Sequence, residues 1–513
     1  MKNVLGREIP EYIEGYGKTK PFEGAFVNTN IAERKAVKVS CTVPGDDKVL
    51  SSIREAIEKC GLKDGMTVSF HHHLRNGDYV LNMVMDEIAK MGLKDMKVAA
   101  SSIFPVHTPL VDHIKNGVVT GLYANYMSGP VADAVSKGLL KTPVIMHTHG
   151  GRARAIEAGD LHIDIAFIAS PTADTYGNIN GVDGPAACGA LGYAVPDAEY
   201  ADKVVAITDN LVPYPACPIE ISQQYVDYVV KVDCIGDPKG IVSGTTRITK
   251  DPVGLRIAKT ASRVIEASGL LKDGFSFQTG AGGTSLAVAS FIKDAMKKKE
   301  IKGSFAAGGT TGYIVDMFKE GLFRNIFDVQ CFDLDAVESY RNNKNHMAMS
   351  ASMYGNPHNK GAVANQLDVM ILGATEIDTD FNVNVTTGSS GVIMGGSGGH
   401  SDTAAGAKLA MVVTQLVKSR LPIVVDRVTT VTTPGESIDV LVTERGVAVN
   451  PRRADLIEKF KAYGIEVKTI QELRKTAIDM TGTPNKLDIS SQVVGVVEYR
   501  DGTVIDVIYK SEE

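Results

Sequence analysis

The sequence has no tryptophan, no Cys-x-x-Cys pair and no long apolar segment. Its six cysteines are scattered along 513 residues, which argues against a disulfide framework or a zinc knuckle and favours buried free thiols. No stretch approaches the roughly 18 apolar residues that a membrane-spanning helix needs. The first residues carry Glu8, Glu11 and Glu14 and lack the basic start and apolar middle of a signal peptide. We therefore expect a cytoplasmic protein.

Neither sign of charge is in large excess. The chain has 60 acidic and 54 basic residues and a formal charge of -6, whereas a protein that binds nucleic acid through phosphates needs a basic excess or stripe. With 44% hydrophobic and 22% charged residues, the composition is that of an ordinary globular protein with room for several domains. The 51 glycines exceed the average usage of about 7% and need an explanation.

Several catalytic and nucleotide-binding motifs are also missing. There is no Gly-x-Ser-x-Gly elbow and no complete P-loop, and Gly280–Gly283 is followed by Ser285 where a dinucleotide fingerprint requires its third glycine. Gly308–Gly312 and Gly395–His400 are further glycine-rich loops. Such loops either form tight turns between strands and helices or bring backbone amides close to an anion or a cofactor.

The chain contains an internal repeat. Arg54–Phe70 and Arg263–Phe277 both have the pattern of a helix, a Lys-Asp-Gly turn and a strand, and Asp164–Asn180 aligns without a gap on Asp368–Asn384 with five identities. The offset is 209 residues between the turn glycines and 204 between the first aspartates. Two collinear matches at nearly one offset predict a duplicated domain.

Short apolar strands alternate with amphipathic helices in both halves. The patterns predict buried strands at Asp368–Leu372 and Leu421–Asp426, and a helix over Arg453–Tyr463 that stops at Gly464. Val493–Tyr509 is predicted to form a hairpin around an Asp-Gly turn.

This alternation predicts an α/β fold with helices on the faces of the sheets, arranged as two tandem, duplicated domains with a cleft between them. The stretch Asp233–Asp251 is rich in glycine and is the best linker. We therefore expect an N-terminal extension at residues 1–40, a first domain at 41–245 and a second domain at 246–513.

Histidines and arginines cluster together in the first half. His71 and His73 point the same way if they continue a strand, Arg75 follows them, and His147-x-His149 precedes Arg152 and Arg154. A metal site is conceivable, since His-x-His on a strand can chelate, but no carboxylate or cysteine lies nearby in sequence. The neighbouring arginines favour a pocket for an anion.

Taken together, these loops resemble those of the CoA-transferase superfamily. Gln278–Gly283 is similar to its Gly-Ile-Gly loop, and Gly396–Asp402 resembles its Gly-x-Gly-Gly-x-x-Asp element. Ser69–Asp78, Gly150–Gly159 and Val497–Asp506 narrow the resemblance to the citrate lyase alpha chains, the citrate CoA-transferase subunits of citrate lyase complexes. The resemblance covers both halves and implies two CoA-transferase-like domains that enclose a thioester.

The resemblance also implies a reaction. Citrate displaces acetate from an acetyl thioester on the acyl carrier (gamma) subunit, and the citryl thioester passes to the lyase (beta) subunit; acetyl-CoA serves as a surrogate donor. We expect an oligomer without a tightly bound cofactor or metal. Ordinary CoA-transferases use a glutamate nucleophile, but the corresponding stretch Phe305–Gly312 has no acid. This departure favours direct attack by citrate through a mixed acetyl-citric anhydride.

Such a route needs no general base, because a citrate carboxylate is already an anion at neutral pH. It needs cations for citrate, backbone amides near the thioester and an oxyanion hole. For citrate we expect His71, His73, Arg75, Arg152 and Arg154. For the thioester we expect Gly280, Gly282, Gly283, Gly308 and Gly309, and as catalytic residues Gly398, Gly399 and His400.

Two alternatives stay open. The first is a transferase for another small carboxylate, such as citramalate, with a covalent glutamate drawn from Glu320, Glu338 or Glu376. The second is a scaffold subunit without activity. The sequence does not distinguish citrate from citramalate, and it does not indicate the oligomeric state, the loop that forms the oxyanion hole, the docking face for the acyl carrier subunit or the role of residues 1–40.

Overall fold

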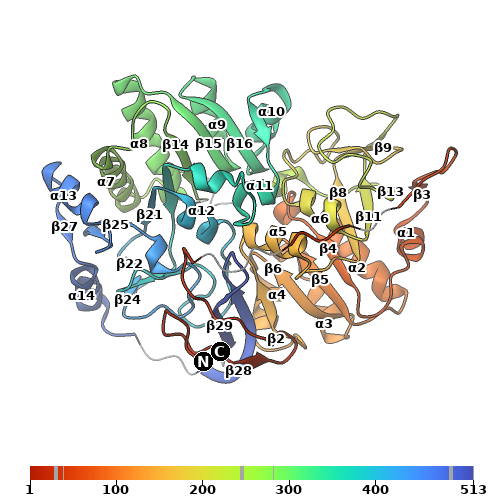
Figure 1. Ribbon diagram of the computed structural model, residues 1–513, viewed down its shortest axis with the longest axis horizontal. Helices are drawn as coiled ribbons and strands as arrows, with labels where there is room; N and C mark the ends of the chain where they lie inside the picture. Colours follow the sequence, from red (N-terminus) through yellow and green to blue (C-terminus); the bar gives the residue numbers. More distant parts are fainter. Residues whose placement is uncertain (28–32, 38–39, 243–247, 281, 485–488, 512–513) are drawn as a thin grey trace.

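The computed structural model describes residues 1–27, 33–37, 40–242, 248–280, 282–484 and 489–511. They form two large sheets that lie side by side, with helices packed on both (Figure 1). Within these ranges, no helix combines the length and the hydropathy needed to cross a bilayer. The chain folds as an α/β protein of two related halves, as predicted.

Each sheet is mainly parallel, with antiparallel pairing near one end. The first contains, in spatial order, β29 (Val504–Ser511), β28 (Ile489–Glu498), β7 (Val144–Met146), β6 (Val119–Ala124), β5 (Met96–Ala100), β4 (Thr67–Phe70), β8 (Ile165–Ser170), β11 (Lys203–Thr208), β13 (Tyr228–Lys231) and β3 (Val49–Leu50). The second contains β17 (His346–Ala348), β16 (Phe323–Cys331), β15 (Gly303–Thr310), β14 (Ser276–Thr279), β18 (Val369–Leu372), β21 (Leu409–Val413), β25 (Val440–Thr443), β26 (Gly446–Val449) and β27 (Val467–Lys468).

The smaller strands pair outside these sheets. They are β1 (Tyr12–Ile13) with β2 (Gly17–Lys18), β9 (Thr172–Asp174) with β10 (Ile179–Asn180) and β12 (Leu211–Val212), β19 (Glu376–Asp378) with β20 (Val383–Asn384) and β24 (Val424–Val425), and β22 (Val417–Lys418) with β23 (Leu421–Pro422).

Helices follow most of the parallel strands. In the first half they are α1 (Ile53–Cys60), α2 (Val80–Lys90), α3 (Leu110–Lys115), α4 (Pro130–Ser136), α5 (His149–Ala158) and α6 (Ala194–Tyr200). In the second half they are α7 (Pro252–Ser268), α8 (Gly283–Lys299), α9 (Gly312–Lys319), α10 (Leu334–Asn342), α11 (Ala351–Gly355), α12 (His400–Gly406), α13 (Ala454–Ala462) and α14 (Ile470–Thr481). Local signals set their ends: Asp251 caps α7, Pro252 occupies its first position, and Gly269 ends it in a left-handed conformation.

The structure confirms the duplication. The order β7-β6-β5-β4-β8-β11-β13 in the first sheet is repeated by β17-β16-β15-β14-β18-β21-β25 in the second. The carboxylate of Asp164 accepts a hydrogen bond from the Thr67 amide (2.8 Å), as that of Asp368 does from the Ser276 amide (2.9 Å). Thr67 and Ser276 are therefore equivalent positions, at the predicted offset.

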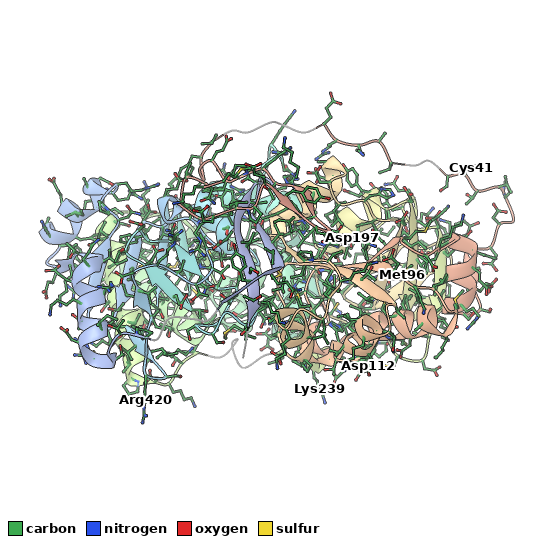
Figure 2. The ribbon with its side chains drawn as sticks, turned by 90° about the horizontal axis from the view of Figure 1, so that it is seen from below. Cys41, Met96, Asp112, Asp197, Lys239 and Arg420 are labelled. Carbon is green, nitrogen blue, oxygen red and sulfur yellow. The ribbon has the colours of Figure 1, made fainter. Side chains whose placement is uncertain are left out.

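Three expectations need correction. Leu421–Asp426 is not one buried strand: it divides into β23 and β24, because Pro422 has no amide to donate to a ladder. Of the cysteines, Cys188 and Cys331 are buried, but Cys60 is half-buried and the other three are exposed. Figure 2 shows one of them, Cys41, on a segment at the outer edge of the first half.

The chain also crosses between the halves at its end. The hairpin of β28 and β29 was expected to lie in a second domain extending to residue 513, but β28 pairs in parallel with β7 of the first sheet. The apolar residues of both strands are buried against the first sheet, and the hairpin is not part of the second sheet. The expected boundary near residue 245 falls in 243–247, outside the described residues.

The N-terminal segment lies over this hairpin, and the two termini are close together (Figure 1). Arg7 pairs with the buried Asp506 of β29 at 2.5 Å and donates to the carbonyls of Val428 (3.1 Å) and Thr429 (2.8 Å) in the second half. Phe22 packs edge-on against Tyr499 with ring centroids 4.8 Å apart. The beginning of the chain therefore ties the hairpin to the second half.

The central contact between the halves is made at the start of α5, which Figure 1 shows in the middle of the molecule with α11 and α12. The buried carboxylate of Asp402 on α12 accepts hydrogen bonds from the Thr148 hydroxyl (2.8 Å) and the Gly150 amide (2.9 Å). Backbone meets backbone here, because a side chain on Gly150 would overlap the Gly355 carbonyl and one on Gly396 would overlap that of Asn125. These glycines set the distance between the halves.

We predict that Gly150→Ala destabilises the protein. The added methyl group meets main-chain atoms of Gly355 and Asn356 that cannot rotate away, and overpacking of this kind costs about 1–3 kcal/mol. Thermal denaturation should show a melting temperature a few degrees below that of Gly361→Ala, the control, where the nearest atom is 3.7 Å away. Equal melting temperatures for the two variants would contradict this account of the contact between the halves.

Candidate active site

The carboxyl ends of the parallel strands of both sheets meet at this central contact. His71–His73 follow β4 and His149 follows β7 in the first half, while Gln330 lies at the end of β16 in the second. The Gln330 side-chain amide donates to the His72 carbonyl at 2.7 Å, and Thr148 pairs with Gly398 in an isolated parallel bridge. In α/β proteins, ligands bind outside the carboxyl ends of the strands, so this junction is the natural place for a site.

Arg75 is the least compensated cation at the junction. Its Nη1 is buried and, among the described residues, has no hydrogen-bond partner. Its guanidinium lies between the rings of Phe332 (4.8 Å) and Phe104 (5.5 Å), and burial lowers its pKa. Arg75 also adopts a φ of 52°, which is uncommon for a residue with a side chain; strained conformations of this kind cluster at active sites and ligand-binding positions.

The predicted cationic histidines are neutral. His71 and His73 contact each other through their Nδ1 atoms, the Ala169 amide donates to His71 Nε2 at 3.0 Å, and the Tyr193 amide donates to His73 Nε2 at 3.3 Å. Burial lowers the pKa of His71 to about 4 and that of His73 well below its usual value. Their placement therefore supports packing at the end of β4 and adds no positive charge for citrate.

Arg152 and Arg154 are occupied within the protein. Arg152 donates to both oxygens of Asp197 (2.6 and 2.8 Å) and to the Ala99 carbonyl (3.0 Å). Arg154 pairs with Asp160 at 2.6 Å and lies 3.9 Å from Glu498. Both arginines are buried. The structure thus does not support the expected role of these two residues in binding citrate, and Arg75 remains as the available cation.

Aromatic side chains that the sequence reasoning missed surround the junction. The Tyr193 ring lies 4.5 Å from His72 and 4.4 Å from His149, and Tyr354 lies 6.5 Å from His149. The Tyr354 hydroxyl accepts a hydrogen bond from Gln278 at 2.8 Å. The His147-x-His149 pair marks this region in the sequence, but Tyr193 caps α6 and Tyr354 lies in α11, both far away in sequence and without a motif.

The predicted catalytic loop is largely occupied by contacts between the halves. The Gly398 amide donates to the Asn125 carbonyl (3.1 Å) and the Gly398 carbonyl accepts from the His149 amide (2.8 Å). The Gly399 amide, at the start of α12, has no hydrogen-bond partner among the described residues. His400 contacts the Thr433 hydroxyl (2.7 Å) and the Gly373 carbonyl (2.9 Å), which orients the helix.

The other predicted glycines border the same junction. A residue larger than glycine at Gly308 would overlap Gln278, and one at Gly309 would overlap the Phe332 ring that covers Arg75. The Gly280 amide donates to the Ile371 carbonyl at 2.8 Å, and Gly282 and Gly283 begin α8 without a side-chain cap. Ala281, between them, lies outside the described residues. These loops bring backbone to the junction without showing which amide meets a thioester.

A buried group with metal-binding side chains supports the end of β16. It consists of Asp328, Cys331 and His346. The Asp328 Oδ2 atom lies 3.0 Å from His346 Nε2 and accepts from the Cys331 thiol at 3.1 Å, while Oδ1 accepts from the Gln330 amide at 2.9 Å. This hydrogen-bond network holds Gln330, which in turn contacts the His72 carbonyl.

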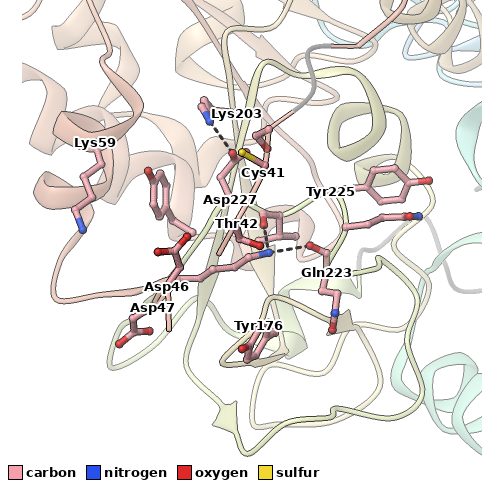
Figure 3. A pocket seen from close by; sticks show the side chains of 15 residues that line it. Cys41, Thr42, Asp46, Asp47, Lys59, Tyr176, Lys203, Gln223, Tyr225 and Asp227 are labelled. Atoms are coloured by element: carbon pink, nitrogen blue, oxygen red, sulfur yellow. Dashed lines mark hydrogen bonds and ion pairs between the residues drawn. The ribbon is translucent and has the colours of Figure 1, made fainter. Parts of the chain in front are cut away.

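A surface pocket lies away from the junction, at the edge of the first sheet (Figure 3). Lys203 pairs with Asp227 at 2.7 Å, and Lys48 donates to the carbonyls of Gln223 (3.0 Å) and Val226 (2.7 Å). None of the residues predicted from the sequence as site residues lines this pocket. The junction is the better candidate.

Comparisons with known proteins identify the family of the chain. The sequence pattern of the citrate lyase alpha subunit family matches residues 46–511. The chain belongs to the citrate lyase alpha subunit family. It is 51% identical to the citrate lyase alpha chain of Haemophilus influenzae over 91% of this chain and 94% of that one. It is 49% identical to that of Klebsiella pneumoniae over 99% of both chains.

A comparison with solved structures indicates the same family. A Streptococcus mutans protein described as the alpha subunit of citrate lyase in complex with citrate is 52% identical and superposes with a TM-score of 0.96 over 100% of both chains. The alpha subunit of a malonate decarboxylase from Acinetobacter baumannii is 17% identical, with a TM-score of 0.63 over 86% of this chain and 94% of that one. The second likeness concerns the fold alone. Residues 1–45 precede the family pattern but are covered in the Klebsiella and Streptococcus comparisons.

Two of the three glutamates considered as covalent nucleophiles are paired with other groups, and the third is exposed. Glu320 pairs with Lys293 and Lys297, each at 2.7 Å, on the surface. Glu338 is exposed on α10, and Glu376 accepts hydrogen bonds from Thr429 and Asn384. None of the three makes a hydrogen bond or ion pair to Arg75, so their placement offers no support for a covalent glutamate.

We predict opposite effects on stability from two arginine substitutions. Arg152→Met leaves Asp197 as an unpaired buried charge, and breaking such a pair costs about 3–5 kcal/mol. Arg75→Met removes a half-buried cation that has no acidic partner among the described residues, so the free energy of unfolding stays equal or rises. Urea denaturation measures both values. If Arg75→Met were as destabilising as Arg152→Met, Arg75 would be a structural residue.

Proposed function

We propose that the chain is a citrate CoA-transferase that converts citrate and an acetyl thioester into a citryl thioester and acetate. The observation that supports this most directly is the half-buried Arg75 at the junction of the two sheets, whose buried Nη1 atom has no hydrogen-bond partner among the described residues. A buried cation without a partner is costly, and a carboxylate of citrate relieves that cost. The citrate in the structure of the Streptococcus relative supports the same substrate.

The reaction requires positioning more than proton transfer. One citrate carboxylate oxygen attacks the carbonyl carbon of the acetyl thioester, the C–S bond breaks, and the thiolate leaves. The thiolate then attacks the citryl carbonyl of the mixed anhydride, and acetate leaves as the C–O bond breaks. Both nucleophiles are anions already. Holding carboxylate and thioester together contributes up to about 7–11 kcal/mol to lowering the barrier.

In this proposal the acetyl group arrives on the acyl carrier (gamma) subunit, and the citryl product passes to the lyase (beta) subunit; acetyl-CoA replaces the carrier in a test with the single chain. Phe305–Gly312, where ordinary CoA-transferases hold their glutamate, has no acid: it forms the end of β15 and the start of α9. This supports direct attack by citrate. The unpaired amide of Gly399 is available to an oxyanion.

The first test concerns Arg75. Arg75→Ala should raise the KM for citrate about 10- to 100-fold, the worth of a hydrogen bond to a charged group, while the KM for acetyl-CoA changes little. Steady-state release of acetate from acetyl-CoA, measured against citrate concentration, gives both values. The control is Arg420→Ala, because Arg420 is exposed on the outside of the second half (Figure 2). Unchanged citrate kinetics in Arg75→Ala would remove this residue from the site.

The second test separates the anhydride route from a covalent glutamate. We expect no modified glutamate after treatment with acetyl-CoA followed by borohydride or hydroxylamine, because Glu320 and Glu376 are paired with other groups and Glu338 is exposed on α10. Peptide mass spectrometry over Glu320, Glu338 and Glu376 reads the result directly. A glutamyl adduct that forms with acetyl-CoA and disappears on adding citrate would replace the anhydride route. A chain that releases no acetate in the presence of citrate would instead be a scaffold.

A further inference from the structure

His149 is a partly accessible histidine at the junction whose ring has one unused nitrogen. The Asn125 Nδ2 atom donates to the Thr148 carbonyl at 3.1 Å, which identifies it as the amide nitrogen, since a carbonyl oxygen only accepts. The same Nδ2 lies 2.9 Å from His149 Nδ1. Because Nδ2 donates, His149 Nδ1 accepts. A neutral His149 must then carry its proton on Nε2.

The Nε2 atom of His149 lies beside the Gly398 backbone. Among the described residues it has no hydrogen-bond partner, and a Cβ on Gly398 would stand 3.3 Å from it. Burial, helped by Arg152, lowers the pKa of His149 to about 3, so the ring stays neutral at physiological pH. The Tyr193 ring, 4.4 Å away, and Tyr354, 6.5 Å away, limit its rotation.

We propose that His149 Nε2–H donates a hydrogen bond to the thioester carbonyl oxygen as it becomes an oxyanion, and that Asn125 is the positioning residue that sets the tautomer. This inference rests on the proposed transferase function. In each half of the reaction, negative charge moves from the attacking oxygen or sulfur to the carbonyl oxygen and then to the leaving group. His149 neither gains nor loses a proton.

A neutral donor suits this position better than a cation. The attacking group and the substrate are anionic, so a cation beside the thioester would also bind a citrate carboxylate in the ground state and gain nothing in the transition state. Arg75 is the cation for the carboxylate, and a neutral N–H addresses charge that appears only in the intermediate. The hydrogen bond from Asn125 keeps the donor in place before the substrate arrives.

The kinetic test compares His149→Phe with His149→Gln. Phenylalanine keeps the ring packing but has no donor, so kcat should fall about 100- to 1000-fold, with the KM for citrate within about threefold. The Nε2–H of glutamine reaches a similar position, and kcat should stay within about tenfold of the wild type. His162→Phe, an exposed histidine paired with Asp164 and Asp202, is the control and should match the wild type.

The outcomes are distinct. An unchanged kcat in His149→Phe overturns the inference, as does a loss confined to the KM for citrate, which would make His149 a citrate ligand. Folding of each variant is checked by circular dichroism, and a properly folded His149→Gln keeps the test valid if His149→Phe misfolds. A wild-type chain without citrate-dependent acetate release would refute the transferase function itself, whatever the variants do.

The tautomer is tested without catalysis. In the protein labelled with ¹⁵N-histidine, a long-range ¹H–¹⁵N spectrum should show His149 protonated on Nε2 and bare on Nδ1, assigned by the signal lost in His149→Gln. Asn125→Leu removes the donor to Nδ1, so a population protonated on Nδ1 should appear and kcat should fall. A wild-type ring protonated on Nδ1 overturns the inference, and an unchanged tautomer in Asn125→Leu overturns the role of Asn125.

Discussion

The buried carboxylate of Asp402 is the contact on which the junction depends. It is fully buried, and burial raises its pKa to about 6. Thr148 and Gly150 donate hydrogen bonds to it from the first half, and the guanidinium of Arg500 lies 3.6 Å from it. Thr148 and Gly150 can donate to Asp402 only while the start of α5 lies against α12. The same contact places the His149 amide on the Gly398 carbonyl, and so the geometry of the candidate site follows from one hydrogen-bonded carboxylate.

Arg75 presents the opposite case. Asp402 has more than one donor, whereas Arg75 Nη1 has no partner among the described residues. Exceptions of this kind to the pairing of buried polar groups are expected at functional sites. Arg152, a few residues into α5, shows that the protein does pair a buried guanidinium when its role is structural.

The repeat and the alternation of strands and helices were enough to predict the fold, because both are local patterns that recur along the chain. The site was harder to predict. Nothing near Arg152 in sequence indicates that Asp197 occupies it, so it looked as available as Arg75. Gly398 and Gly399 were expected to be catalytic, but the Gly398 amide and carbonyl make hydrogen bonds to Asn125 and His149 of the other half, which only tertiary structure reveals. The alternation of strands and helices along the chain also does not indicate that β28 pairs with β7 of the first sheet.

The two halves carry different residues at the equivalent positions that face the junction. Because Thr67 corresponds to Ser276, the residues His71 and His73 correspond to Gly280 and Gly282. Asp174 with Asn178 and Asp378 with Asn382, by contrast, make the same turn with the same hydrogen bonds in both halves. The copies thus agree where the residues only hold a turn and differ where the sheets face each other. The first half contributes the histidines and Arg75, and the second half contributes the glycine loops together with the rings of Phe332 and Tyr354.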